Sequence, residues 1–220
     1  MSTPTLSLLA IVSVGCATAG PGVAAENQPD ADTNHHDDAS EVDSPPAHTD
    51  AASSGSCADA FTGVLASWAF SGDAGSQTTT ASTSTATGVA AGGIARASGL
   101  SVNTGSDSMN ASNWPTATQR DASKYFTFSI TPPAGCSLDL TSASIDAKSS
   151  STGPSKASIG TDADSFAQEQ TVSTSAAGNA TLSVANATSA VEVRIYGWSA
   201  SSSGGTMRLE GTLTLTGVLH

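Results

Sequence analysis

The residues that could carry out acid–base, nucleophilic or metal chemistry are unevenly distributed along this 220-residue chain. Three of the four histidines, His35, His36 and His48, lie in the first 50 residues, and the fourth, His220, is the last residue. The chain after residue 55 therefore has no internal histidine for a Ser-His-Asp or Cys-His hydrolase, or for a His-ligated zinc site. We expect no enzymatic activity, no metal site and no cofactor there.

Carboxylates leave glycoside hydrolysis as the one catalytic alternative, since it needs only a pair of Asp or Glu side chains about 5 to 9.5 Å apart. The carboxylates after residue 55 are scattered, which is typical of a solvated surface. Asp162-Ala163-Asp164 has the alternating oxygens of a calcium loop but lacks the other EF-hand ligands and the glycine, and so indicates a polar turn. The carboxylates after residue 55 are Asp59, Asp73, Asp107, Asp121, Asp139, Asp146, Asp162, Asp164, Glu169, Glu192 and Glu210.

The three cysteines indicate an oxidising compartment. Cys16 follows an apolar segment, Leu6 to Val14, that is too short to span a bilayer but long enough for the core of a signal peptide. Gly15-Cys16 is like the end of a bacterial lipobox, and we expect Cys16 to be lipidated. The alternative is cleavage at Ala17-Thr18-Ala19, which would release a soluble protein. In either case Cys57 and Cys136 remain, and we predict that they form a disulfide.

Residues 1–16 are thus predicted to be a signal peptide, and residues 17–55 a disordered acidic linker. From Gly20 to Gly55 there is no Lys, Arg, Leu or aromatic residue, and eight carboxylates contribute most of the net charge of −12. Such a segment buries too little apolar surface to offset its chain entropy. The histidines at its centre match no structural zinc spacing. We expect an exported protein that is held at the outer membrane or cell surface by a lipid, or is otherwise secreted or periplasmic.

Residues 56–220 are predicted to form one all-β domain, an antiparallel two-sheet β-sandwich of the jelly-roll or Ig-like kind with about eight to nine strands. Apolar residues alternate with polar ones at a period of two, which is typical of strands with one buried and one solvated face. Leu138 and Leu140, followed by Ala143 and Ile145, change phase, so we expect a β-bulge near Thr141 or Ser142. The predicted inward residues are Val64, Ala66, Trp68, Phe70, Phe126, Phe128, Ile130, Val191, Val193, Ile195, Met207, Leu209, Leu213 and Leu215.

Several motifs follow one another in a familiar order: Lys124 to Pro132 (KYFTFSITP), Leu138 to Asp146, Ser151-Thr152-Gly153-Pro154, Arg194 to Trp198 (RIYGW), and Met207 to Gly211 (MRLEG). Together they resemble a bacterial secreted β-sandwich domain that occurs in proteins with PEP-CTERM or type IX sorting tails. The resemblance runs from Trp68 to Gly217. It implies a fold and an exterior location, and it implies no catalytic activity.

This chain departs from the pattern at three places. Lys148 and Ser149 stand where the family commonly has an Arg pair, and Cys136 lies near a position where the family has an aromatic residue. From the residues after the last strand we also expect no sorting tail. Lipidation of Cys16 would then be the means of retention.

The low content of basic residues, seven Lys and Arg in the whole chain, argues against a nucleic-acid partner, which would need clustered cations for phosphate contacts. We therefore expect a non-enzymatic envelope or surface module with a structural, adhesive or interaction role. Its partners would be the membrane, through the lipid anchor, and a glycan or a surface protein. The alternative is a jelly-roll carbohydrate-binding module. Trp114, Tyr196 and Trp198 would then contact the glycan, unless Trp114 and Trp198 close the ends of the core instead.

Overall fold

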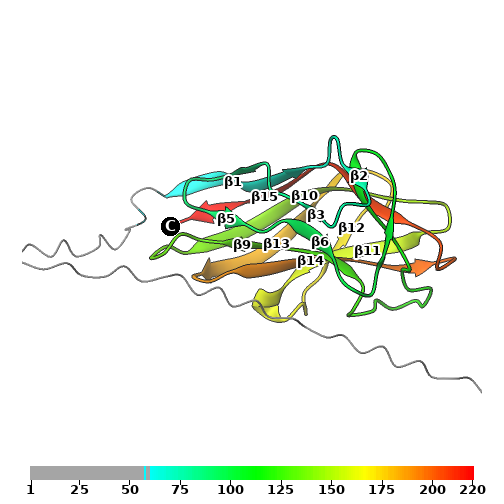
Figure 1. The fold of residues 1–220 in the computed structure, drawn as a ribbon. Helices are drawn as coiled ribbons and strands as arrows, with labels where there is room; N and C mark the ends of the chain where they lie inside the picture. The colour runs from blue at the N-terminus through cyan, green and yellow to red at the C-terminus, as the bar shows by residue number, and fades with distance from the viewer. Residues whose placement is uncertain (1–56, 58–59) are drawn as a thin grey trace, which may run out of the picture. The chain divides into compact units, whose positions relative to one another are not determined.

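The computed structural model describes Cys57 and residues 60–220. The predicted signal peptide with Cys16 and the acidic linker lie outside these residues. In the described part the chain is all-β, with two packed sheets and one short 3₁₀ turn, η1 (Asp162–Asp164), which confirms the predicted β-sandwich (Figure 1). None of the helical segments described here has the length and hydrophobicity to cross a membrane.

The described residues form fifteen strands, more than the eight to nine expected; eight of them have five or more residues, and seven have two or three. The long strands are β1 (Phe61–Ala69), β8 (Ser108–Ser112), β9 (Tyr125–Thr131), β10 (Leu138–Ser149), β11 (Pro154–Thr161), β13 (Gly178–Ala187), β14 (Val191–Ala200) and β15 (Met207–Leu219). The short strands are β2 (Ala74–Gly75), β3 (Thr79–Thr80), β4 (Ser84–Thr85), β5 (Ala90–Ala91), β6 (Ile94–Arg96), β7 (Ser101–Asn103) and β12 (Gln170–Val172).

The order of the strands is that of a jelly roll rather than of an Ig domain. One sheet has the order β13-β10-β15-β1-β4, and the other β12-β11-β14-β9-β6-β3. Successive long strands from β9 to β15 therefore alternate between the sheets, as the two interlocked Greek keys of a jelly roll require. All pairs are antiparallel except the short pair of β2 with β8, which is parallel.

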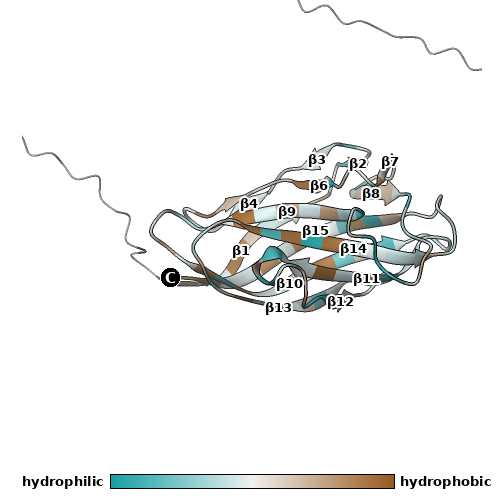
Figure 2. Ribbon diagram, turned by 90° about the horizontal axis from the view of Figure 1, so that it is seen from below, coloured by the Kyte–Doolittle hydropathy of each residue, from teal (hydrophilic) through white to brown (hydrophobic). Residues whose placement is uncertain are grey.

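Because apolar residues occur at every second position of a strand, their side chains point between the two sheets. Phe126, Phe128 and Ile130 of β9 are at most 3% exposed, and Val191, Val193 and Ile195 of β14 follow the same rule. The polar residues between them face outward, and brown and teal segments alternate along β14 in Figure 2. At about 25 cal/mol per Å² of buried apolar surface, this packing is the main stabilising contribution to the domain.

Two bulges decide which residues of the central strands point inward. The register of β10 shifts between Leu140 and Ser142 against both neighbouring strands, which confirms the predicted bulge. A second shift lies in β1 between Val64 and Ala66. It turns Leu65 into the core and leaves Val64 46% exposed, so the inward position predicted for Val64 is wrong. The bulge adds one residue to β1 and thereby inverts the alternation before it.

An arginine joins the two sheets at the end that holds the short strands. Arg96 of β6 is in register with Phe126, a core residue, and so points between the sheets. Its guanidinium donates hydrogen bonds to the carbonyl oxygens of Asn110 (2.7 Å), Gln77 (2.6 Å) and Gly75. Burial lowers the pKa of Arg96. Because its donors meet three backbone carbonyl oxygens from the other sheet and the connection that follows it, we interpret Arg96 as a structural clamp.

A disulfide closes the other end of the sandwich. The structure joins Cys57 to Cys136, with Cα atoms 5.4 Å apart, a separation that suits an unstrained backbone. Cys136 lies in the turn between β9 and β10. The start of β1 and the C-terminus lie at this same end, with Phe61 in register with Leu219 (Figure 1).

Replacing Cys57 with Ser in protein exported to an oxidising compartment should lower the free energy of unfolding by about 2–4 kcal/mol, because the unfolded chain loses a cross-link between residues 79 apart. Denaturant titration measures this. Added reductant should lower the stability of the wild type to that of the variant and leave the variant unchanged. Recovery of both cysteines as alkylatable thiols without reductant would contradict the pairing.

Candidate functional site

The three aromatic residues predicted to contact a glycan have different environments. Trp114 is 1% exposed, its indole N–H donates to the Ala111 carbonyl oxygen (2.9 Å), and its ring packs edge-on against Phe126 at 5.4 Å. It closes the end of the core. The prediction that Trp114 contacts a sugar is therefore wrong, since no face of the ring reaches solvent.

Tyr196 is also buried, but on the outer face of the seven-stranded sheet. It lies between the outward-facing Ser158 of β11 and Tyr125 of β9, and it does not belong to the core between the sheets. It is 0% exposed because side chains from two loops cover it, so the prediction that it contacts a sugar is also wrong for the structure as it stands. Trp198, two residues further along β14, is half-buried and remains accessible in part.

The residues around Tyr196 form the most organised group of functional side chains on this face. We call Arg120, Tyr125, Phe166, Arg194 and Tyr196 the outer cluster. Tyr125, Arg194 and Tyr196 come from β9 and β14, whose register brings them together. Arg120 and Phe166 come from loops that precede β9 and follow β11.

Cation–π stacking holds the outer cluster together. The Arg120 guanidinium lies 4.4 Å from the centre of the Tyr196 ring. The Arg194 guanidinium lies 4.2 Å from the centres of both the Tyr125 and the Phe166 rings. Each such contact contributes about 0.5–2 kcal/mol, depending on how much water is excluded. The tyrosine rings meet edge-on at 5.5 Å.

Glu192 neutralises Arg194 through two parallel hydrogen bonds of 2.8 and 2.9 Å, and Thr127 donates a third to the same carboxylate (2.8 Å). The bonds from Arg194 are the main reason that the pKa of Glu192 is lowered, although partial burial opposes them. The same pair raises the pKa of Arg194. Glu192 is therefore the counter-ion of Arg194.

Glu169 plays the corresponding part for Arg120. Its Oε1 lies 2.5 Å from Arg120 Nε, and its Oε2 accepts a hydrogen bond from Ser158 (2.6 Å). Beside it, Asp164 and Gln168 line a polar hollow of about 50 Å³ that also touches Thr181 and Ser183 of β13. The loop between β11 and β12 thus lies over the outer cluster on one side and over this hollow on the other.

That loop has a strained backbone. Ser165 and Phe166 both have φ of +59°, a left-handed conformation that costs a residue with a side chain about 1–2 kcal/mol. Asp164 Oδ2 accepts a hydrogen bond from the Gln168 amide (2.8 Å), and Asp162 Oδ1 accepts one from the Glu192 amide (2.9 Å). These two carboxylates therefore cap backbone amides, as expected for a polar turn.

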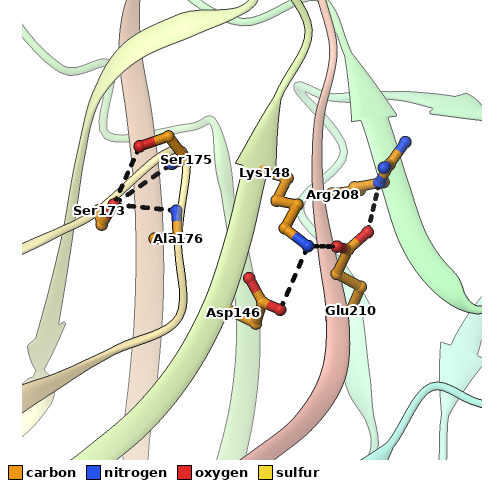
Figure 3. Close-up of polar contacts among 7 residues, drawn as sticks. All are labelled: Asp146, Lys148, Ser173, Ser175, Ala176, Arg208 and Glu210. Atoms are coloured by element: carbon orange, nitrogen blue, oxygen red, sulfur yellow. Dashed lines mark hydrogen bonds and ion pairs between the residues drawn. The ribbon is translucent and has the colours of Figure 1, made fainter.

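The eight-stranded sheet carries a second charged group on its outer face, shown in Figure 3. Glu210 of β15 pairs with Lys148 and with Arg208 (2.6 Å), and Lys148 also lies 3.5 Å from Asp146. Partial burial raises the pKa of Glu210, but hydrogen bonds from Lys148 and Arg208 outweigh it, so that the pKa is lowered. The two cations of this group are exposed, its two carboxylates are half-buried, and no aromatic ring is among the residues drawn.

In the part of the chain that the structure describes, no three His, Cys, Asp or Glu side chains come together as metal ligands would. No protein-family model, no curated protein and no solved structure matches this chain.

Sequence patterns gave a partial signal for the outer cluster. Glu192, Arg194 and Tyr196 alternate along β14 and thus had to share its outer face. The contributions of Arg120, Phe166 and Glu169 carry no such signal, because loop residues have no periodicity that fixes their direction.

Replacing Arg194 with Lys should lower the free energy of unfolding by about 1 kcal/mol, since an ammonium group makes neither the bidentate contact with Glu192 nor two ring stacks. Thermal or denaturant unfolding measures the effect. The matched control is Arg208→Lys, which alters a 45% exposed side chain and should change stability by less than about 0.5 kcal/mol. Equal effects of the two substitutions would show that the stacks contribute nothing.

The lowered pKa of Glu192 predicts an acid-dependent loss of stability. Its folded pKa lies below its ordinary value of 4.5, so the unfolded state binds more protons and stability falls as pH falls through that range. Denaturant titrations at about pH 6 and at successively lower pH should show a smaller loss for Glu192→Gln than for the wild type. An identical decline in both proteins would contradict the assigned role.

Proposed function

We propose that this chain is an exported, non-enzymatic β-sandwich module of the bacterial cell envelope or surface, with a structural, adhesive or interaction role. The observation that supports its non-enzymatic part is the ion pairing of two of its carboxylates. Glu192 is bound by Arg194 at 2.8 and 2.9 Å, Glu210 is bound by Lys148 and Arg208, and both carboxylates have lowered pKa values. A general acid for glycoside hydrolysis needs a raised pKa, so these two residues are poorly suited to that role.

Export and lipid anchoring are supported by the sequence and by the cysteines. The Gly15-Cys16 pair after an apolar segment supports a lipid anchor, and the resemblance to secreted β-sandwich domains supports an exterior location. A disulfide between Cys57 and Cys136 fits an oxidising compartment. The membrane, through the lipid on Cys16, and a glycan or surface protein are the proposed partners.

The alternative function, a carbohydrate-binding module, is favoured by the state of Trp198. This tryptophan is half-buried, and its indole N–H has no hydrogen-bond partner among the described residues. The indole N–H groups of Trp68 and Trp114, in contrast, donate to the carbonyl oxygens of Gly92 and Ala111 at 2.9 Å. A fold shared with many lectins does not itself establish sugar binding.

The anchoring part of the proposal is tested on the mature protein. We expect it to partition into detergent, and its N-terminal peptide to begin at Cys16 and to carry acyl mass. A Cys16→Ala variant should accumulate in an unprocessed or released form, whereas Cys57→Ser should be anchored as the wild type is. A mature terminus at Gly20, found by mass spectrometry, would show that the protein is not lipidated.

A further inference from the structure

We propose that the free edge of β13 is an interface at which two copies of this chain pair, strand against antiparallel strand, about a two-fold axis. The pair would continue the eight-stranded sheet of one copy into that of the other. This interface goes beyond the proposed function and depends neither on export nor on the lipid anchor.

Among the outermost strands of the two sheets, β13 is the only long one in the described part of the chain. One sheet order ends at β13 and β4, and the other at β12 and β3. The strands β3, β4 and β12, and the side branches β2, β5 and β7, have two or three residues, whereas β13 has ten. A short edge strand protects a monomer, because the edge of a sheet presents unpaired amide and carbonyl groups to other chains. β13 is hydrogen-bonded to β10 alone and lacks this protection.

β13 also lacks the side chains that discourage strand pairing. Natural edge strands commonly carry a lysine or another charged residue, or a proline. The sequence has no charged residue and no proline at positions 170–191. The register of β13 against β10 shifts twice, but buried and exposed side chains alternate without interruption over residues 179–185. The strand therefore presents the regular alternation that an added strand requires.

The chain does not cover this edge itself. The neighbouring strand is β12, which lies at the same side of the sandwich but belongs to the other sheet and forms no ladder with β13 (Figure 2). Two hollows of about 50 and 20 Å³ lie between them. The larger is lined by Gln170 and residues 181–183, and the smaller by residues 171–173 and 178–180. The main chain of β13 is thus open to a further strand on the side away from β10.

The exposed side chains of β13 give no means of selecting a foreign strand. They are short and uncharged, whereas peptide-binding edges take their specificity from pockets for the side chains of the added strand. The exposed residues in question are Asn179, Thr181, Ser183 and Ala185. A second copy of the chain needs no such selection, because it presents the same strand.

A second copy is complementary to this edge by symmetry. Two-fold antiparallel pairing that keeps the core sides of both sheets together sets buried residues against buried ones and exposed residues against exposed ones. Opposed hydroxyls of Thr181 and Ser183 can then hydrogen-bond across the pair. Each chain has a net charge of −12, so an uncharged strand is also a place where two copies meet without like charges facing each other. The buried residues of β13 are Ala180, Leu182 and Val184, which are 4–6% exposed.

Sedimentation velocity of the mature full chain over about 1–100 μM tests the proposal, with detergent micelles in excess if the chain carries a lipid. We expect a monomer–dimer equilibrium with a dissociation constant in the micromolar range, because one strand pair buries less than a standard interface of about 1,600 Å². Hydrogen exchange of the wild type should show amide protection that increases with concentration in β13 and not in β1.

Lysines on the edge strand should break the dimer. Thr181→Lys/Ser183→Lys should raise the dissociation constant at least about tenfold, because a two-fold register centred on residue 181, 182 or 183 sets like charges opposite each other. Both positions are exposed, so the fold should be retained, which the denaturant midpoint of the variant checks. The matched control is Thr212→Lys/Thr214→Lys, which places the same charges at the same spacing on β15, an interior strand of the same sheet. It should change the dissociation constant by less than about twofold.

The proposal is overturned if the wild type stays monomeric over the whole range, which would leave a strand of a different protein as the occupant of this edge. It is also overturned if the β13 variant dimerises as tightly as the wild type, or if the β15 control weakens the dimer equally. Concentration-dependent protection at Phe61 and Val64 of β1, which are 40% and 46% exposed, would overturn it in favour of another interface. None of these results bears on the proposed envelope function, which is decided by the mature N-terminus and the location of the protein.

Discussion

The two-sided nature of a pleated strand is the constraint on which the rest of this structure depends. One residue in two is placed between the sheets and the next on an outer face, so a chain with few large side chains can still enclose a continuous core. The side chains on the outer faces are then mostly hydroxyls, with a small number of charged groups. Of the seven Lys and Arg in the chain, Arg96, Arg194 and Arg120 each make several contacts.

The small number of cations also explains how the outer cluster is built. Arg194 stacks on two rings and binds a carboxylate at the same time, and Arg120 covers a tyrosine while it meets Glu169. On a sheet rich in Ser and Thr, these guanidinium groups substitute for the apolar cover that larger side chains would provide. The result is a small second layer outside the seven-stranded sheet, in which charge and aromatic surface are held close together.

The strands β1, β9, β10, β14 and β15 and the bulge of β10 were predictable from sequence, because alternation over five or more residues outweighs local propensity. The segment before β9 was not, since β2 to β7 have only two or three residues each and cannot show a period. Val64 shows a different limit, because nothing in the neighbouring residues marks the bulge that exposes it. The burial of Trp114 and Tyr196 depends on loops that fold back from elsewhere in the chain, and alternation carries no information about them.

The disulfide has a mechanical consequence for a domain that is pulled at its N-terminal end. Without it, tension entering at residue 57 would act on the first strand, and the pair β1–β15 would separate one hydrogen bond after another from Phe61 onward. The bond to Cys136 instead passes the load to the connection between β9 and β10, which belong to opposite sheets. Tension is then shared between both layers of the sandwich, and the terminal strand is spared.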